Sequence, residues 1–207
     1  MKKFLSVLFA LTGWFAVTAQ FALMIENRSA PVAETIIRFF SFFTILTNIL
    51  VAVYFTLNTF NPAIVRKPGT LTAVTIYIFM AGAVYQVILR ATWNPEGLQL
   101  IVDELLHTVI PVLAIIFWAV YEDKKAVTLR QIPKWVIYPL AYLAFILIRG
   151  SFSNFYPYPF VNVSEIGMTK TLLNSAVLVL VFFIISALFV ITGKYFSKKQ
   201  QEETASS

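Results

Sequence analysis

The sequence predicts an all-α membrane protein in which six transmembrane helices form one polytopic bundle. The first observation is composition: 59% of the 207 residues are hydrophobic and 13% are charged, with a mean hydropathy of +0.79. A soluble domain of this length could not bury so much apolar surface, whereas lipid accepts it. The second observation is six apolar runs, most of them near the ~20 residues that a spanning helix needs. The runs are continuous rather than alternating, which favours helices over the strands of a membrane barrel.

In order, the runs cover residues 4–25, 35–57, 73–89, 100–121, 135–148 and 171–192. The first run follows Lys2 and Lys3 and resembles a signal peptide with a cleavage site after Ala19. It continues to Ile25, however, which is long enough to span a bilayer, so we expect a retained helix. The fifth run is the shortest, and we expect it to be tilted, broken or short.

Proline positions and the polar C-terminus define the expected domain organisation. Most prolines fall between runs, but Pro111 and Pro139 lie inside runs and are expected to kink them. The connections leave no room for a second folded unit, so residues 1–198 are predicted to form a single six-helix transmembrane domain. Residues 199–207 are polar and are predicted to form a disordered cytoplasmic tail.

The basic residues predict the orientation of the bundle. Cytoplasmic loops of membrane proteins carry an excess of Lys and Arg. Of the 16 basic residues here, eleven fall on the side that holds both termini and five on the other side. We therefore expect an integral protein of a bacterial plasma membrane with both termini in the cytoplasm.

Composition also excludes several kinds of function. The chain has no cysteine and a single histidine, so thiolate and His-rich metal sites are excluded, and we expect no metal or cofactor. The net charge of +6 is scattered over short flanks beside apolar runs, which indicates a topology signal. Nucleic acid is therefore not an expected partner.

Several ionisable residues lie within or at the ends of apolar runs on the predicted external side. They are Arg38, Arg90, Asp103, Glu104, His107 and Arg149. Charged groups at this depth are costly, so they usually face one another or a water-filled cavity, and we expect one polar vestibule here. The simpler alternative is that long side chains extend to the interface. That alternative suits Arg90 and Arg149, but it suits His107 less because its side chain is short.

A polar stripe crosses the second apolar run. Its members are Ser41, Thr44, Thr47 and Asn48, whose spacing of three or four residues places them on one helix face. Such residues often hydrogen-bond neighbouring helices, and contact between helices is the simpler interpretation of the stripe. The alternative is a reactive site in which Thr44 is a nucleophile and one of the other three donates to a developing oxyanion.

Depth in the membrane connects Thr44 with His107. Thr44 lies nine residues into its run and His107 seven residues into the fourth run. These positions correspond to depths of roughly 13 Å and 10 Å at the helical rise. A threonine hydroxyl needs a base to take its proton, and histidine is the usual base. Asp103 or Glu104, one turn earlier, could orient the imidazole ring.

Three stretches resemble the signature regions of one membrane family. They are residues 42–55 with Phe42-Phe43-Thr44 and Asn48, residues 106–111 with Leu106-His107-Thr108 and Pro111, and the aromatic-proline loop at residues 156–160. In this order they resemble the bacterial and fungal Pr6Pr membrane proteins, which are related to the androgen-induced and androgen-dependent membrane proteins of animals. The resemblance covers most of the chain.

The resemblance implies a function for two residues. The animal relatives are threonine hydrolases that cleave fatty acid esters of hydroxy fatty acids, and their nucleophile and essential histidine correspond to Thr44 and His107. They carry an acidic residue at the position of Thr47. The implied activity is an intramembrane hydrolase acting on a membrane lipid or acyl ester. The alternatives are a transporter or lipid-binding protein that uses the same polar cluster, and a structural scaffold. The sequence leaves the substrate and the oligomeric state open.

Overall fold

A computed structural model of the chain describes residues 1–205, with side chains for residues 1–198. Throughout the described residues the secondary structure is helical and contains no strand. Six helices in this part of the chain are long and apolar enough to cross a membrane. They are Lys2–Glu26, Phe43–Phe60, Thr70–Thr92, Gly97–Tyr121, Leu129–Ser153 and Val163–Lys198. The predicted fold class is therefore confirmed, and the chain is an integral membrane protein with an all-α bundle of transmembrane helices.

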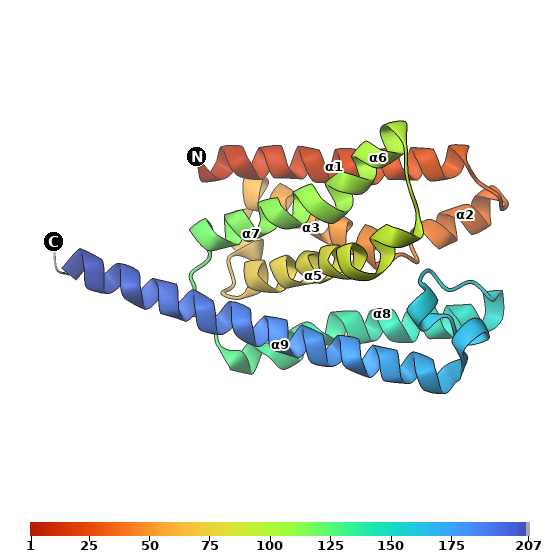
Figure 1. The fold of residues 1–207 in the computed structure, drawn as a ribbon. Coiled ribbons are helices and arrows are strands. Elements are labelled where there is room, and N and C mark those ends of the chain that lie inside the picture. Colours follow the sequence, from red (N-terminus) through yellow and green to blue (C-terminus); the bar gives the residue numbers. More distant parts are fainter. Residues whose placement is uncertain (206–207) are drawn as a thin grey trace. The chain divides into compact units, whose positions relative to one another are not determined.

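The chain divides into two compact units, Met1–Asp123 and Lys124–Ser207, where the sequence predicted a single domain over residues 1–198. The first unit contains α1 (Lys2–Glu26), α2 (Val32–Phe39), α3 (Phe43–Phe60), α4 (Pro62–Val65), α5 (Thr70–Val84), α6 (Gly97–Glu104) and α7 (Ile110–Tyr121) (Figure 1). Two π-helical segments, η1 (Tyr85–Leu89) and η3 (Leu105–Val109), and the 3₁₀ turn η2 (Arg90–Thr92) complete it. The second unit contains η4 (Leu129–Gln131), α8 (Ile132–Ser153), η5 (Pro159–Val161) and α9 (Val163–Ala205).

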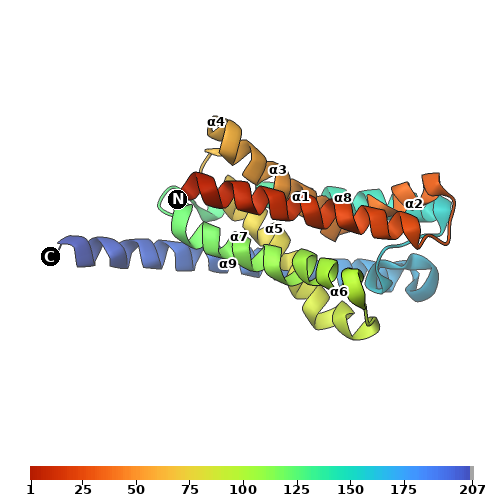
Figure 2. The same ribbon diagram turned by 90° about the horizontal axis from the view of Figure 1, so that it is seen from above.

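In the first unit, α1, α3, α5 and α7 lie alongside one another (Figure 1, Figure 2). The rings of Phe9, Phe55 and Phe117 form the centre where α1, α3 and α7 meet, with edge-to-face pairs whose centroids are 4.9 to 5.9 Å apart. Gly13 lets α1 approach α3 closely, because a Cβ atom there would lie 3.0 Å from the Cβ of Ala52. Small residues at such a crossing are typical of membrane helix packing.

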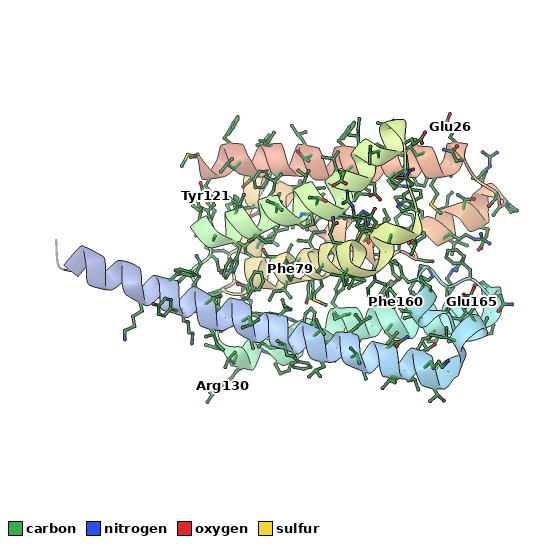
Figure 3. All side chains as sticks on the ribbon, viewed as in Figure 1. Glu26, Phe79, Tyr121, Arg130, Phe160 and Glu165 are labelled. Atoms are coloured by element: carbon green, nitrogen blue, oxygen red, sulfur yellow. The ribbon has the colours of Figure 1, made fainter. Side chains whose placement is uncertain are left out.

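The helices of this unit alternate in direction. The Lys2 ammonium lies 5.5 Å from the ring centroid of Tyr121, so the start of α1 and the end of α7 share one end of the unit. Figure 3 shows Glu26, at the other end of α1, on the opposite side from Tyr121. At the Tyr121 end, the Glu122 carboxylate accepts hydrogen bonds at 2.8 Å from both the backbone N–H and the hydroxyl of Thr72. This carboxylate therefore caps the first turn of α5.

The second predicted helix is interrupted, which corrects the expectation of one continuous run over residues 35–57. Helix α2 ends at Phe39, and α3 begins at Phe43 after an extended Phe42. At the break, the Ser41 hydroxyl donates to the Ile37 carbonyl at 2.7 Å, and its backbone N–H closes a turn onto Arg38. The depth estimate for Thr44 does not apply to this geometry, because Thr44 lies in the first turn of a separate helix.

In the second unit, α8 and α9 run antiparallel and are joined by the aromatic-proline loop. The fifth span was expected to be short or broken, but it covers 25 residues and continues past Pro139. Gly150 leaves room for the Tyr156 ring, because a Cβ atom there would lie 2.1 Å from Tyr156 Cε1. Helix α9 departs from helical geometry at Gly167, where φ is 77°, and continues to Ala205. The disorder predicted for residues 199–207 stays a prediction, and residues 206–207 lie outside the described part.

Candidate active site

The fourth span is not a regular α-helix where His107 lies, because η3 separates α6 from α7. The backbone N–H of Ile110 donates to the carbonyl of Leu105, five residues earlier, rather than to Leu106. Pro111 has no N–H to donate to His107. The carbonyls of Leu106 and His107 therefore lack the donors that an α-helix would supply. Such π-helical segments are rare and are often found at functional sites.

Asp103 holds one side of the His107 ring. The Nδ1 atom of His107 lies 3.0 Å from the backbone carbonyl oxygen of Asp103 and 3.2 Å from its carboxylate Oδ1. A carbonyl oxygen can only accept, so Nδ1 must carry the proton, and in the neutral ring Nε2 holds the lone pair. Within residues 1–198, Nε2 makes no hydrogen bond. The imidazole therefore presents a basic nitrogen in a side chain that is 13% exposed.

Tyr85 completes this cluster and was not singled out from the sequence. Its ring stacks on the His107 ring with centroids 3.8 Å apart and planes 13° from parallel. Its hydroxyl donates to Asp103 Oδ2. Both Tyr85 and Asp103 are buried. A tyrosine among apolar residues is ordinary in a membrane helix, so only the contact between helices distinguishes this one.

Asn48 connects α3 to the π-helical turn of His107. Its Nδ2 atom donates to the Thr44 carbonyl at 2.9 Å and to the Leu106 carbonyl at 3.3 Å. The second bond supplies the donor that Leu106 has lost. Both carbonyls thus lie beside one nitrogen, which places the first turn of α3 next to η3. The Asn48 Oδ1 atom is buried and has no hydrogen-bond partner in the described part of the chain.

These bonds already occupy two of the three candidate oxyanion donors. Asn48 uses its amide protons on two backbone carbonyls, and Ser41 donates its hydroxyl proton to Ile37. Neither side chain is available as an oxyanion donor in this geometry. Thr47 is fully buried on α3, and its role stays a prediction. Thr44 itself is 8% exposed in the first turn of α3.

A second polar network lies beside the Tyr85–Asp103–His107 cluster. The Arg90 guanidinium pairs with Glu104, and Glu104 Oε2 accepts from the Thr108 hydroxyl at 2.7 Å. Gln86 Nε2 donates to that hydroxyl at 2.9 Å, and its Oε1 accepts from Arg90 at 3.0 Å. These four side chains form a closed ring between η1–η2 and α6–η3. Arg90, Asp103, Glu104 and His107 of the predicted vestibule are thus brought together.

The two other arginines of the predicted vestibule belong to other helices. Arg38 is on α2, where its Nε atom donates to Glu34 at 2.8 Å. Arg149 is in the second unit, where its guanidinium lies 4.9 Å from the centroid of the Phe155 ring and donates to the Phe155 carbonyl at 3.4 Å. Their participation in a vestibule stays a prediction.

The fold and this cluster define a class: an α-helical integral membrane protein with a buried Tyr–Asp–His cluster between π-helical turns. No group of three or more His, Asp or Glu side chains in the described residues could hold a metal ion. Comparisons with protein families, with curated proteins and with solved structures found no match. The chemistry of the site must therefore be argued from its geometry.

Proposed function

We propose that the protein is an intramembrane hydrolase of lipid esters, with Thr44 as nucleophile and His107 as general base. One observation carries the proposal: Asp103 holds His107 Nδ1, which leaves the Nε2 lone pair available. The Asn48 bridge supports the pairing with Thr44, because it joins the first turn of α3 to the turn that contains His107. A nucleophile, a base and a group that orients the base are the parts that acyl transfer requires.

The reaction follows from these roles. His107 Nε2 takes the hydroxyl proton of Thr44 while Oγ1 attacks the ester carbonyl. The tetrahedral intermediate expels the alcohol, which leaves with the proton from His107, and an acyl-threonine ester remains. Water then gives a proton to His107 and attacks that ester, and the proton returns to Thr44 as the carboxylic acid departs. The ring alternates between neutral and protonated forms, and the Asp103 carboxylate stabilises the protonated form.

The position of Thr44 supports the same chemistry. The first turn of a helix lies at the positive end of the helix dipole, where backbone N–H groups point outward. Negative charge that develops on the ester oxygen beside Thr44 is favoured there. The Glu104 charge is compensated by Arg90, whereas the Asp103 carboxylate keeps its charge beside His107 and stabilises the protonated ring.

The proposal extends to membership of the Pr6Pr family, which the sequence resembles. It also places the protein in a bacterial plasma membrane with both termini in the cytoplasm. The substrate is a membrane lipid or another acyl ester, and the reaction as drawn uses no cofactor. The acyl chain would enter from the lipid side, where apolar side chains of α1, α6 and α7 are exposed. The apolar chain needs no water-filled path to reach the site.

The test uses the purified full chain in detergent with para-nitrophenyl acyl esters and a fluorophosphonate probe. Thr44→Ala and His107→Ala are each expected to reduce turnover and labelling to background, while Thr44→Ser retains part of the activity because it keeps a hydroxyl. Thr59→Ala is the matched control, because Thr59 is also 8% exposed and lies on α3. If Thr44→Ala hydrolyses esters and takes up the probe as wild type does, the proposal is wrong. Binding of a labelled lipid without turnover would then favour the transporter or lipid-binding alternative.

A further inference from the structure

We infer that Tyr85 is a positioning residue that holds the His107 ring and the Asp103 carboxylate in one arrangement, so that His107 keeps its lone pair on Nε2. As a statement about catalysis this rests on the proposed function. As a statement about the imidazole it can be tested without any substrate. The inference depends on two separate contacts of one side chain, which different substitutions can remove separately.

The first contact is the hydroxyl bond to Asp103. Tyr85 donates to Oδ2, and His107 Nδ1 faces Oδ1 at 3.2 Å. Each carboxylate oxygen therefore has its own partner, and the carboxylate cannot turn without losing one of them. Asp103 is 3% exposed, and a buried carboxylate is tolerated only when its oxygens accept hydrogen bonds. The Tyr85 hydroxyl thus fixes the carboxylate that, together with the backbone carbonyl of Asp103, faces the Nδ1–H group.

The second contact is the ring stack. The Tyr85 and His107 rings are 3.8 Å apart and nearly parallel, so the imidazole cannot rotate about χ2 without colliding with the phenol. A tilt of the ring would move Nε2 away from its direction even if Nδ1 remained bonded. Stacking and hydrogen bonding therefore constrain two different motions of His107.

Backbone geometry explains why Tyr85 reaches this position. Tyr85 begins η1, where the N–H of Arg90 donates to the Tyr85 carbonyl five residues back, and His107 lies in η3. Gly82, three residues before Tyr85, allows the two segments to come close. A Cβ atom at Gly82 would lie 2.7 Å from the His107 carbonyl oxygen. The close approach at Gly82 and the π-helical register together place the two rings face to face.

The protonation of the two ring nitrogens can be measured without overlapping signals, because His107 is the only histidine in the sequence. Protein labelled with nitrogen-15 histidine and purified without a histidine tag gives the signals of one imidazole. At a pH where the ring is neutral, we expect wild type to show a protonated Nδ1 and an unprotonated Nε2. We also expect the ring protons of His107 to be shifted by the ring current of Tyr85.

Two substitutions separate the two contacts. Tyr85→Phe keeps the stack and is expected to keep the ring-current shift, while the Nδ1 signal changes because the Asp103 carboxylate is no longer fixed beside it. Tyr85→Leu is expected to lose both signatures. Tyr77→Phe is the control, because Tyr77 is a buried tyrosine of α5 and its change should leave both signatures as in wild type. If Tyr85→Leu does not fold, Tyr85→Phe alone decides the role of the hydroxyl.

The inference is overturned if the Tyr85→Phe protein has the Nδ1 signal of wild type. In the activity assay, Tyr85→Phe is expected to lower kcat by about 10²-fold with little change in KM. A changed Nδ1 signal in Tyr85→Phe together with an active Thr44→Ala would uphold the positioning role and reject the hydrolase. An unchanged Nδ1 signal together with an inactive Thr44→Ala would reject the positioning role and uphold the hydrolase.

Discussion

Asn48 on α3 donates its side-chain amide to the Leu106 carbonyl at 3.3 Å, and this bond spans the two helices that carry Thr44 and His107. The carbonyl is available because Ile110 donates to Leu105 and Pro111 has no N–H. Asn48 therefore supplies the donor that the π-helical turn does not give to the Leu106 carbonyl. A bundle that lost Asn48 would leave the buried Leu106 carbonyl without a donor.

Asn48→Ala is expected to destabilise the protein by about 1–3 kcal/mol, because the Leu106 carbonyl is left buried and unsatisfied. Asn48→Asp should cost more, since a carboxylate would face two carbonyl oxygens. Thermal unfolding in one detergent measures both changes. Asn58→Ala is the control on the same helix: Asn58 bonds only the Ser6 hydroxyl, and its site is partly buried, so a smaller loss is expected. An Asn58→Ala loss equal to that of Asn48→Ala would contradict this ranking.

Gly82→Ala is expected to push α5 away from η3. The added methyl group would lie 2.7 Å from the His107 carbonyl oxygen and 3.1 Å from Pro111 Cγ, which are backbone and ring atoms that cannot turn aside. Overpacking of this kind costs about 1–3 kcal/mol. The His107 ring-proton shifts should move toward those of Tyr85→Leu. Gly13→Ala meets a methyl group at 3.0 Å in a different interface and should leave the His107 signals in place.

Much of the fold could be predicted because a bilayer reduces the problem to the length and polarity of apolar runs. The spacing of Asp103 and His107 also puts them one turn apart, and their contact follows from it. Opposite charges within apolar runs tend to pair, as Arg90 and Glu104 do. The first contact depends on local sequence alone, whereas the second also needs η2 and α6 to lie side by side.

The break before Thr44, the two π-helical segments and the role of Tyr85 could not be predicted in this way. Each depends on hydrogen bonds between distant segments, as in the bond from Asn48 to Leu106. Standard helical spacing assigns every residue the same rise and turn, so a π-helical turn changes which residues face a neighbour without any compositional sign. The contact of Tyr85 with His107 can be recognised only once the packing of η1 against η3 is known.

Glu122→Ala is expected to destabilise the first unit without affecting the site. Its carboxylate accepts two bonds at 2.8 Å from Thr72 at the start of α5, and hydrogen bonds to charged groups contribute about 1.5–3 kcal/mol. The expected result is a lower melting temperature with an unchanged kcat per folded molecule. Asp123→Ala, at the next and exposed position, should leave the melting temperature unchanged. If kcat per folded molecule also fell, the contact between Glu122 and Thr72 would influence the site.

The orientation predicts a cytoplasmic C-terminus. A reporter that is active only in the cytoplasm, fused after Ser207, is expected to be active because eleven of the 16 basic residues lie on the predicted cytoplasmic side. A reporter that is active only outside the cytoplasm, fused at the same position, is the control. Activity of the second reporter without activity of the first would mean that the predicted orientation is wrong.

Asp103 and Glu104 are adjacent carboxylates with different partners, and this difference gives the sharpest test of the proposed base. Asp103 contacts His107 Nδ1, whereas Glu104 pairs with Arg90. Asp103→Asn removes the charge that stabilises the protonated ring, while the backbone carbonyl at this position still accepts from Nδ1. We expect kcat to fall on the order of 10⁴-fold, as for another carboxylate that orients a catalytic imidazole.

Glu104→Gln is the matched control, because it also replaces a carboxylate with the corresponding amide, at the neighbouring position. Its amide oxygen still accepts from Thr108 or Arg90, so we expect kcat to change by less than about tenfold, since a partly exposed ion pair contributes about 1 kcal/mol or less. The nitrogen-15 signals of His107 should change in Asp103→Asn and stay as in wild type in Glu104→Gln. If Glu104→Gln reduces kcat more than Asp103→Asn does, Asp103 is not the group that orients His107, because the ring would then depend on the network of Arg90 rather than on its own contact.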